Sequence, residues 1–387
     1  MRRVQQVGRA VCLVAVLLLG GIGTCAQAAS SPARSSAGLT ECLGYYTVAL
    51  PGEFEYALMS NFSQGLGAWS SEIRLDLLGL QAQELSISHP AAAAEIEALM
   101  ESRNKEQRRE KQTLLERVRK YQTDLQFSKE HDPDGSYRKE LLERADRVPF
   151  TQSVPSRDAI YFPDKDQLIF HALVNGHILS TELKPQGTPE QTLDAFLSHY
   201  KPRALGEVPT GPGVCVPFGV FTGEKQPATV GLNIRLKDQP DIVVFLLARD
   251  AAKDEPEDPR KLFDGLTPAS TFFGSRQVTP IHRIKPLQAI TIDGNDGLGS
   301  FVRVTRKTVI DQSRAFNNAA ENDEDWGYFA YVPGLSGGKP GDSFNLMFRV
   351  ERFGRFAKRS MSENEFRELT LRIAASIKRR PGAGIRN

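Results

Sequence analysis

The fold of this chain is decided by the stretch CLGYYTVALP, residues 42–51. It combines a cysteine, a run of β-branched and aromatic residues typical of a strand, and a proline that ends the strand. A second cysteine, Cys215, lies far downstream in the similar run GVCV, residues 213–216. Whether these two predicted strands are covalently joined determines the compartment of the protein and the size of its first domain.

The length and charge of the chain limit its class. At 387 residues it is longer than a single hydrophobic core usually supports, so two domains are predicted. Without Arg2, Arg3 and Arg9, which belong to a predicted export signal, 46 basic residues stand against 47 acidic ones. This near-neutral charge argues against nucleic acid or an anionic membrane surface as a partner.

Residues 1–28 have the three parts of a secretory signal peptide. Basic residues come first, 10–22 are apolar, and Ala26-Gln27-Ala28 fits the small-residue cleavage rule. The apolar part is too short for a stable membrane span, so cleavage after Ala28 is predicted. Two alternatives stay open: an uncleaved anchor, and a lipoprotein attached through Cys25, although Thr24 is a poor residue before a lipidated cysteine.

Cleavage would leave only Cys42 and Cys215 in the mature chain. Two cysteines in an oxidising compartment pair most simply with each other, and two buried thiols are the alternative. A bond would close a loop of 173 residues. The chain-entropy model gives such a loop an upper stabilisation of about 5 kcal/mol.

The fold class expected is α+β, with two domains that each pack helices on an antiparallel sheet. Alternating apolar residues predict short strands joined by turns, which favours antiparallel pairing over a parallel nucleotide-binding sheet. A flexible lead is predicted at 29–40 and an N-terminal domain at 41–250. A charged, proline-bearing linker at 251–259 precedes a C-terminal domain at 260–387.

One long charged helix is predicted in the first domain, at about residues 90–130. Apolar residues lie near its two ends, whereas Glu101 to Thr113 contains none. Two interpretations stay open. The helix packs at its ends and is solvated in the middle, or it is a polar arm that grips a partner protein.

Local signals elsewhere predict turns and helix caps. Asn175-Gly176 lies between two strand-like runs and specifies a tight hairpin. Thr188 with Gln191, and Ser362 with Glu365, form capping boxes for two helices. His171 and His177 flank the hairpin turn, but no third ligand is near them in sequence, so no metal site is predicted.

Patterns that resemble catalytic motifs lack their context. Residues 334–338, GLSGG, match the serine-hydrolase pattern around Ser336, yet Pro340 follows closely and no histidine occurs after His282. The glycines of 293–299 lack the strand-loop-helix context of a dinucleotide site and indicate a turn. No catalytic, cofactor-binding or metal-binding residue is therefore predicted, and a hydrolase using Ser336 is a weak alternative.

A cluster of acidic residues beside an aromatic one is the candidate partner-binding site. Dense charge next to a tryptophan suits a recognition loop, although acidic loops are commonly just solvated. The candidate residues are Glu321, Asp323, Glu324, Asp325 and Trp326.

The export signal and three further segments of the chain together carry a family resemblance. With its export signal, the CLGYYTVALP stretch, the GVCV run at Cys215 and the ending RPGA at 380–383, the chain resembles the two-domain periplasmic immunity proteins cognate to type VI secretion lipase effectors. The resemblance implies a non-catalytic antitoxin. It would hold a phospholipase effector between its two domains, as a monomer in a 1:1 complex. A general periplasmic binding or envelope-assembly protein is the alternative.

Overall fold

The computed structural model describes residues 38–56, 72–77, 80–155, 157–223, 228–250, 258, 260, 281–283, 287–305, 324–334 and 343–383. The predicted signal peptide, most of the lead and nearly all of the linker lie outside these residues. No helix among the described residues is long and apolar enough to cross a membrane.

The opening stretch forms a hairpin rather than the single strand predicted. Strands β1 (Leu39–Leu43) and β2 (Tyr46–Leu50) pair antiparallel, with Cys42 opposite Thr47. Gly44 makes the reversal possible because its φ of 58° is in the left-handed region that glycine tolerates. Strand β20 (Lys378–Arg379) pairs with β2, so the start and the end of the described chain share one small sheet.

A second small sheet carries Cys215. Strands β10 (Tyr200–Pro202), β12 (Gly219–Phe221) and β11 (Val214–Val216) lie in that order, all antiparallel. The strand predicted at Cys215 is short, because Pro217 and Phe218 form a two-residue turn between β11 and β12. Phe218 has a φ of 58°, which is unusual for a bulky residue.

The remaining strands of the described chain form one large antiparallel sheet, which confirms the predicted α+β class. The order is β15-β17-β18-β19-β14-β13-β4-β5-β9-β8-β7-β6, with β16 beside β17 and β3 beside β13. The bounds are β3 Phe54–Tyr56, β4 Glu72–Leu77, β5 Leu80–Pro90, β6 Gln152–Ser153, β7 Ala159–Asp164, β8 Gln167–Val174, β9 His177–Leu183, β13 Ala228–Leu236, β14 Ile242–Asp250, β15 Ile281–Arg283, β16 Gln288–Ile292, β17 Asn295–Thr305, β18 Glu324–Val332 and β19 Phe344–Arg352.

Strands from both sides of the predicted linker pair directly. β14 precedes residues 251–259 and pairs with β19 along its whole length, from Ile242 opposite Arg352 to Asp250 opposite Phe344. β2 and β20 join the two halves a second time. The division into domains at 251–259 stays a prediction, and these pairings connect the two halves through backbone hydrogen bonds.

Two turns follow the sequence signals. Asn175 and Gly176, with φ of 49° and 75°, connect β8 to β9 and confirm the predicted hairpin. Asp293 and Gly294, with φ of 52° and 78°, connect β16 to β17 in the same way. Both pairs satisfy the positive φ angles that this type of two-residue turn requires.

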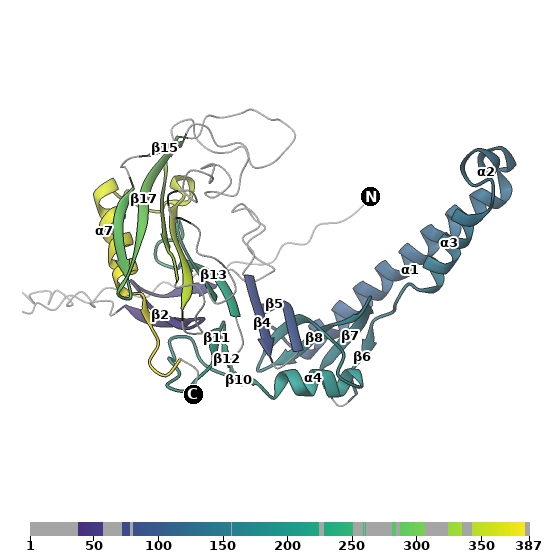
Figure 1. The fold of residues 1–387 in the computed structure, drawn as a ribbon, viewed down its shortest axis with the longest axis horizontal. Coiled ribbons are helices and arrows are strands. Elements are labelled where there is room, and N and C mark those ends of the chain that lie inside the picture. The colour runs from purple at the N-terminus through teal and green to yellow at the C-terminus, as the bar shows by residue number, and fades with distance from the viewer. Residues whose placement is uncertain are drawn as a thin grey trace, which may run out of the picture. The chain divides into compact units, whose positions relative to one another are not determined.

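The predicted long helix is two helices, α1 (Ala93–Thr123) and α2 (Leu125–His131). They are separated at Asp124, whose side chain accepts a hydrogen bond from Phe127 N at 2.9 Å and so caps α2. Helix α3 (Ser136–Asp146) follows, and Figure 1 shows it beside α1. This α1–α3 pair has its own small core, formed by Leu114, Val118, Leu141, Ala145 and Val148.

The other helices begin where the sequence predicts. α4 (Pro189–Leu197) starts at the Thr188 and Gln191 capping box, and α7 (Glu363–Ser376) starts at the Ser362 and Glu365 box. A short 3-10 helix spans Gly354–Phe356. The buried face of α7 packs on the sheet through Phe366, whose ring lies 5.8 Å from that of Trp326. Figure 1 shows α7 against the sheet near β17.

Candidate functional site: the disulfide junction

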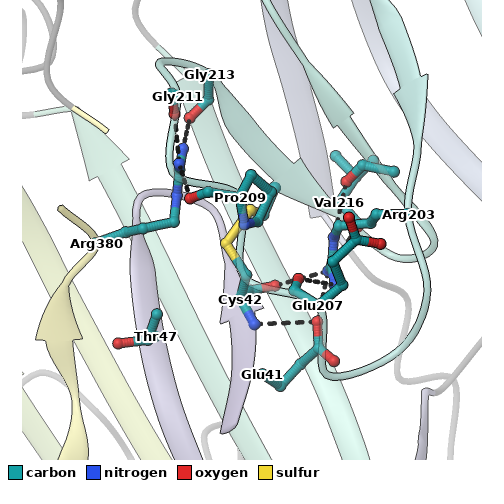
Figure 2. The surroundings of a disulfide bond; sticks show 12 residues. Glu41, Cys42, Thr47, Arg203, Glu207, Pro209, Gly211, Gly213, Val216 and Arg380 are labelled. Carbon is teal, nitrogen blue, oxygen red and sulfur yellow. Dashed lines mark hydrogen bonds and ion pairs between the residues drawn. A yellow bond between two sulfur atoms is a disulfide. The ribbon is translucent and has the colours of Figure 1, made fainter. Parts of the chain in front are cut away.

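The three segments that carry the family resemblance meet at one place in the structure, here called the junction. It comprises residues 41–46, 200–221 and 378–383 (Figure 2). Cys42 and Cys215 are joined by a disulfide with a Cα–Cα distance of 5.8 Å, and both are fully buried. The disulfide expected from the two remaining cysteines is therefore present.

Backbone hydrogen bonds support the disulfide on both sides. Gly44 N donates to Cys215 O at 2.9 Å, and Cys215 N donates to Gly44 O at 2.8 Å. This isolated bridge lies two residues from Cys42 and aligns the first hairpin with β11. The covalent bond and the bridge together fix the register between segments that are 173 residues apart.

A buried ion pair lies beside the disulfide. Arg203 Nη2 is 2.5 Å from Glu41 Oε1, and the two side chains are 1% and 0% exposed. The same Nη2 donates to the carbonyls of Cys42 and Val216 at 2.9 and 3.0 Å. Further donors of Arg203 bond the carbonyls of Gly219, Ala204 and Glu207. The guanidinium therefore connects the first hairpin to β11 and β12.

The carboxylate of this pair is satisfied as well. Glu41 Oε1 accepts from Cys42 N at 3.0 Å, and Oε2 accepts from Gly206 N at 2.7 Å. Burial lowers the pKa of Arg203, but its interactions with Tyr56 and Glu41 outweigh this effect, so the pKa is raised overall. Burial and Glu41 raise the pKa of Tyr56 well above its ordinary value. The guanidinium therefore stays charged, and the phenol stays neutral.

A second arginine binds the loop that precedes Cys215. Arg380 Nη1 donates to the carbonyls of Pro209 and Gly211 at 2.6 and 2.5 Å, and Nη2 donates to Gly213 O at 2.6 Å (Figure 2). Its backbone N donates to Tyr45 O at 2.8 Å. Burial and the charge of Arg203 lower the pKa of Arg380. We call the three carbonyls the carbonyl cage.

The junction is built for mechanical connection. The terminal nitrogens of both guanidinium groups bond to protein oxygens, and the cysteine sulfurs are consumed in the disulfide. Among the described residues, no group of three His, Cys, Asp or Glu side chains is placed to hold a metal ion. What the arrangement can do is hold three distant segments in one rigid geometry.

The predicted partner-binding residues do not come together as an exposed loop. Glu321 and Asp323 lie outside the described residues, and Glu324 begins β18. Asp325 is fully buried and accepts a hydrogen bond from Gly354 N at 2.8 Å. Trp326 is buried between Phe366 and the guanidinium of Arg352, which lies 4.6 Å from its ring. Asp325 and Trp326 therefore offer no surface to a partner.

The two hairpin histidines have partners within the chain. His171 Nδ1 lies 2.7 Å from Ser180 Oγ, and His177 Nδ1 lies 3.0 Å from Ser88 O. The His177 ring stacks on Phe218 at 3.9 Å, which places the turn of β11 and β12 against β9. Burial, together with the charge of Arg103, lowers the pKa of His171 to about 4.

The middle of α1 is anchored by amides, a contact that the sequence does not predict. Gln107 is buried, and its Oε1 accepts from Thr151 N at 3.1 Å. Asn104 Oδ1 accepts from the same nitrogen at 2.9 Å, and its Nδ2 donates to Thr151 O at 3.3 Å. The helix is therefore held at its polar middle as well as at its apolar ends.

Sequence reasoning missed the charged residues of the junction. A weak signal exists for Glu41, which occupies the same face of β1 as Leu39 and Leu43 and so stands at an inward position of the strand. Arg203 lies in a polar segment with no such periodicity. Its burial depends on the ion pair with Glu41. Glu41 is 162 positions away in the sequence, so no local sequence pattern indicates that the two residues meet.

No protein-family model matches the chain, and no curated protein matches it in sequence. Solved structures, in contrast, do match the chain. The immunity protein TplEi of the type VI secretion system (T6SS) from Pseudomonas aeruginosa, complexed with the "L" peptide, matches at 14% identity and a TM-score of 0.47. Its apo structure matches at 13% and 0.46, and a chain of the Tle4–Tli4 complex at 12% and 0.48.

Each of these matches covers 90% of this chain and 99% of the other. The class predicted from the motifs, a type VI secretion immunity protein, is the class of TplEi. At this identity and TM-score, the likeness concerns the arrangement of elements and transfers no residue's role.

Proposed function

We propose that this protein is a periplasmic immunity protein that binds a type VI secretion phospholipase effector and inhibits it. The observation that carries the proposal is the junction. The three sequence segments that resemble the immunity family are the ones that the fold ties together, through the disulfide and the carbonyl cage. Sequence motifs that connect distant segments rigidly are consistent with a protein that acts by presenting a fixed binding surface.

Rigidity is useful to an inhibitor of this kind. Binding costs free energy when loops and domains must be ordered, and a preorganised surface avoids part of that cost. The disulfide and the buried ion pair fix the first hairpin, the Cys215 segment and the last strand before any partner arrives. A disulfide also suits the oxidising periplasm, which is where an exported antitoxin would meet its effector.

Co-expression in the periplasm tests the proposal. The full chain, with its own signal and an affinity tag, is expressed together with a candidate type VI secretion phospholipase effector. We expect a 1:1 complex on purification, survival of the cells, and loss of phospholipase activity on liposomes when the two proteins are mixed. A chain that lacks residues 1–28 stays in the cytoplasm and serves as the control, and it should not protect.

The outcomes separate the proposal from its alternatives. No complex and no protection would reject the immunity function. An envelope defect on deletion in a strain without any lipase effector would favour the envelope-assembly alternative instead. Ser336→Ala should leave protection and lipase inhibition unchanged. Loss of an intrinsic esterase activity in that variant would instead favour the hydrolase alternative.

A further inference from the structure

The disulfide lies next to a loop, residues 209–213, that the C-terminal segment binds through hydrogen bonds. Cys215 lies two residues after Gly213, and Gly213 contributes one carbonyl of the cage around Arg380. Pro209 and Gly211 contribute the others. Figure 2 shows these residues among the surroundings of the disulfide. The position of residues 209–213 therefore depends on a side chain that lies more than 160 residues further along the chain.

A second contact presses the C-terminal segment onto the same loop. Gly382 has a φ of 75°, and a Cβ at that position would lie 2.4 Å from Thr210 O. Only glycine allows this close approach of the two backbones. Ala383 N donates to Arg380 O at 3.1 Å, which closes the turn, and Ala383 is buried. The RPGA segment, residues 380–383, thus contacts the 209–213 loop at two points, Arg380 and Gly382.

The two arginines of the junction differ in how firmly they are held. Arg203 has a buried carboxylate partner, so its release would cost the separation of an ion pair. Arg380 has, among the described residues, only carbonyl partners, and its Nε has no hydrogen-bond partner. Hydrogen bonds from a guanidinium to neutral carbonyls are weaker than those to a carboxylate, so Arg380 is held less firmly than Arg203. Local opening of the junction is therefore expected to begin at Arg380.

We propose that residues 378–383 form a strap that gates the disulfide. With Arg380 in the carbonyl cage, residues 209–213 cover the Cys42–Cys215 bond and keep thiols from it. When Arg380 leaves the cage, the loop moves and the bond becomes accessible to reduction. The strap thus controls the redox stability of the joint between the first hairpin and the Cys215 segment, a property that does not depend on the partner.

The reaction that reports on the gate is thiol–disulfide exchange with dithiothreitol. One dithiothreitol thiolate attacks a protein sulfur, breaks the S–S bond and releases the other cysteine as a thiolate. The second dithiothreitol thiolate then displaces the first cysteine and closes a cyclic disulfide. Two electrons pass from dithiothreitol to the protein, the two cysteines take up two protons, and the reagent is oxidised.

The experiment measures the rate of this reduction in the folded mature chain. Samples are quenched over time with a maleimide–polyethylene glycol, which shifts the band on a gel for each free thiol. Arg380→Ala should be reduced at least ten-fold faster than the wild type. Lys378→Ala is the matched control because its exposed side chain lies only two residues before Arg380, and its rate should stay within two-fold of the wild type.

Equal rates for Arg380→Ala and the wild type would overturn the proposal, as would an equal acceleration in Lys378→Ala. Low millimolar methylguanidinium should slow the reduction of Arg380→Ala by occupying the empty cage. If that variant does not fold, Arg380→Lys decides the question. Lysine keeps the charge but carries its donors on one nitrogen, whereas Arg380 bonds Pro209 and Gly211 from Nη1 and Gly213 from Nη2. Several-fold faster reduction is therefore expected, and a wild-type rate contradicts the strap.

Discussion

The junction and the α1–α3 pair use charged residues in opposite ways. In the junction, Arg203 and Glu41 are buried, and one guanidinium reaches Cys42 across 161 positions of sequence. In the α1–α3 pair, Arg147 and Glu143 are four residues apart and largely exposed, with a distance of 2.9 Å. One region is held by contacts between distant segments, and the other by neighbours along a helix and a five-residue core.

The two regions are expected to differ in how cooperatively they unfold. A buried charge cannot lose its partner without a large penalty, so the Arg203–Glu41 pair should separate only when much of the molecule unfolds. Separating an exposed ion pair costs little free energy, because water solvates each charge in place of its partner. We therefore expect the α1–α3 pair to unfold as a local unit and the Arg203–Glu41 pair of the junction to report on global stability. The predictions below are ordered by expected effect.

Glu41→Gln tests the buried pair. The substitution keeps an accepting oxygen but removes the charge that compensates Arg203, so it should lower the free energy of unfolding by about 3–5 kcal/mol. Urea unfolding of the oxidised protein measures this loss. Glu53→Gln is the control, because Glu53 pairs with Lys237 at 3.2 Å on the surface. An equal effect in both variants would contradict the distinction between buried and exposed pairs.

Leu141→Ala tests whether the α1–α3 pair is a separate unit. Leu141 is fully buried in the small core, and its truncation should cost about 3 kcal/mol. Hydrogen exchange should become faster in α1 and α3, while β1, β2 and β11 stay protected. The neighbouring Leu142 is 39% exposed, so Leu142→Ala should change little. Loss of protection in the junction would show that the two regions unfold together.

Removal of the disulfide, by Cys42→Ala combined with Cys215→Ala, should destabilise the protein by about 2–4 kcal/mol. The bond closes a loop of 173 residues, and its loss raises the entropy of the unfolded chain. Urea unfolding gives the size of the effect. Hydrogen exchange within α1 and α3 should stay at the wild-type rate, and a parallel increase there would argue against local independence.

His171 makes stability depend on pH. Its pKa falls from the ordinary 6.5 to about 4 because the ring is buried and Arg103 repels the charged form. The unfolded chain binds a proton near pH 6.5 and the folded one does not. The resulting stability is present above pH 6.5 and is lost as pH falls toward 4, by about 2 kcal/mol between pH 7 and pH 5.

Thermal unfolding at a series of pH values measures this loss. His171→Gln keeps a polar group opposite Ser180 Oγ but has no proton to gain, so the part of the slope between pH 7 and pH 5 that belongs to His171 should disappear. An unchanged slope in the variant would assign the acid sensitivity to other groups.

Arg147→Ala should have the smallest effect, at most about 0.5 kcal/mol. Its side chain is 77% exposed, and its partner Glu143 is on the same helix. Urea unfolding at low and high salt measures the difference, which salt should reduce further. A loss as large as that of Glu41→Gln would contradict the local character of this region.

Much of the local structure could be predicted from the sequence, because the responsible residues are neighbours. Asn175 and Gly176 specify their own turn, and Thr188 and Ser362 cap the helices that follow them. Errors arose where one residue interrupts a pattern. Gly44 turns a predicted strand into a hairpin, and Asp124 divides a predicted helix into two.

The candidate site could be predicted only in part. The pairing of Cys42 with Cys215 follows from counting the cysteines of the mature chain. Glu321 and Asp323 lie outside the described residues, so a role for the acidic cluster stays a prediction there. From Asp325 to Val332 both faces of β18 are buried, which removes Asp325 and Trp326 from the surface. Charge density alone does not distinguish a solvated loop from a strand end.

The sequence by itself determined the α+β class, the turns and the helix caps, since each depends on composition or on residues a few positions apart. Only the tertiary structure decided that Arg203 meets Glu41, that Arg380 fills a cage of three carbonyls, and that the halves of the chain share a sheet. The physical reason is that a charged side chain is stable in the interior only when distant segments deliver its partners, and that distance leaves no local pattern.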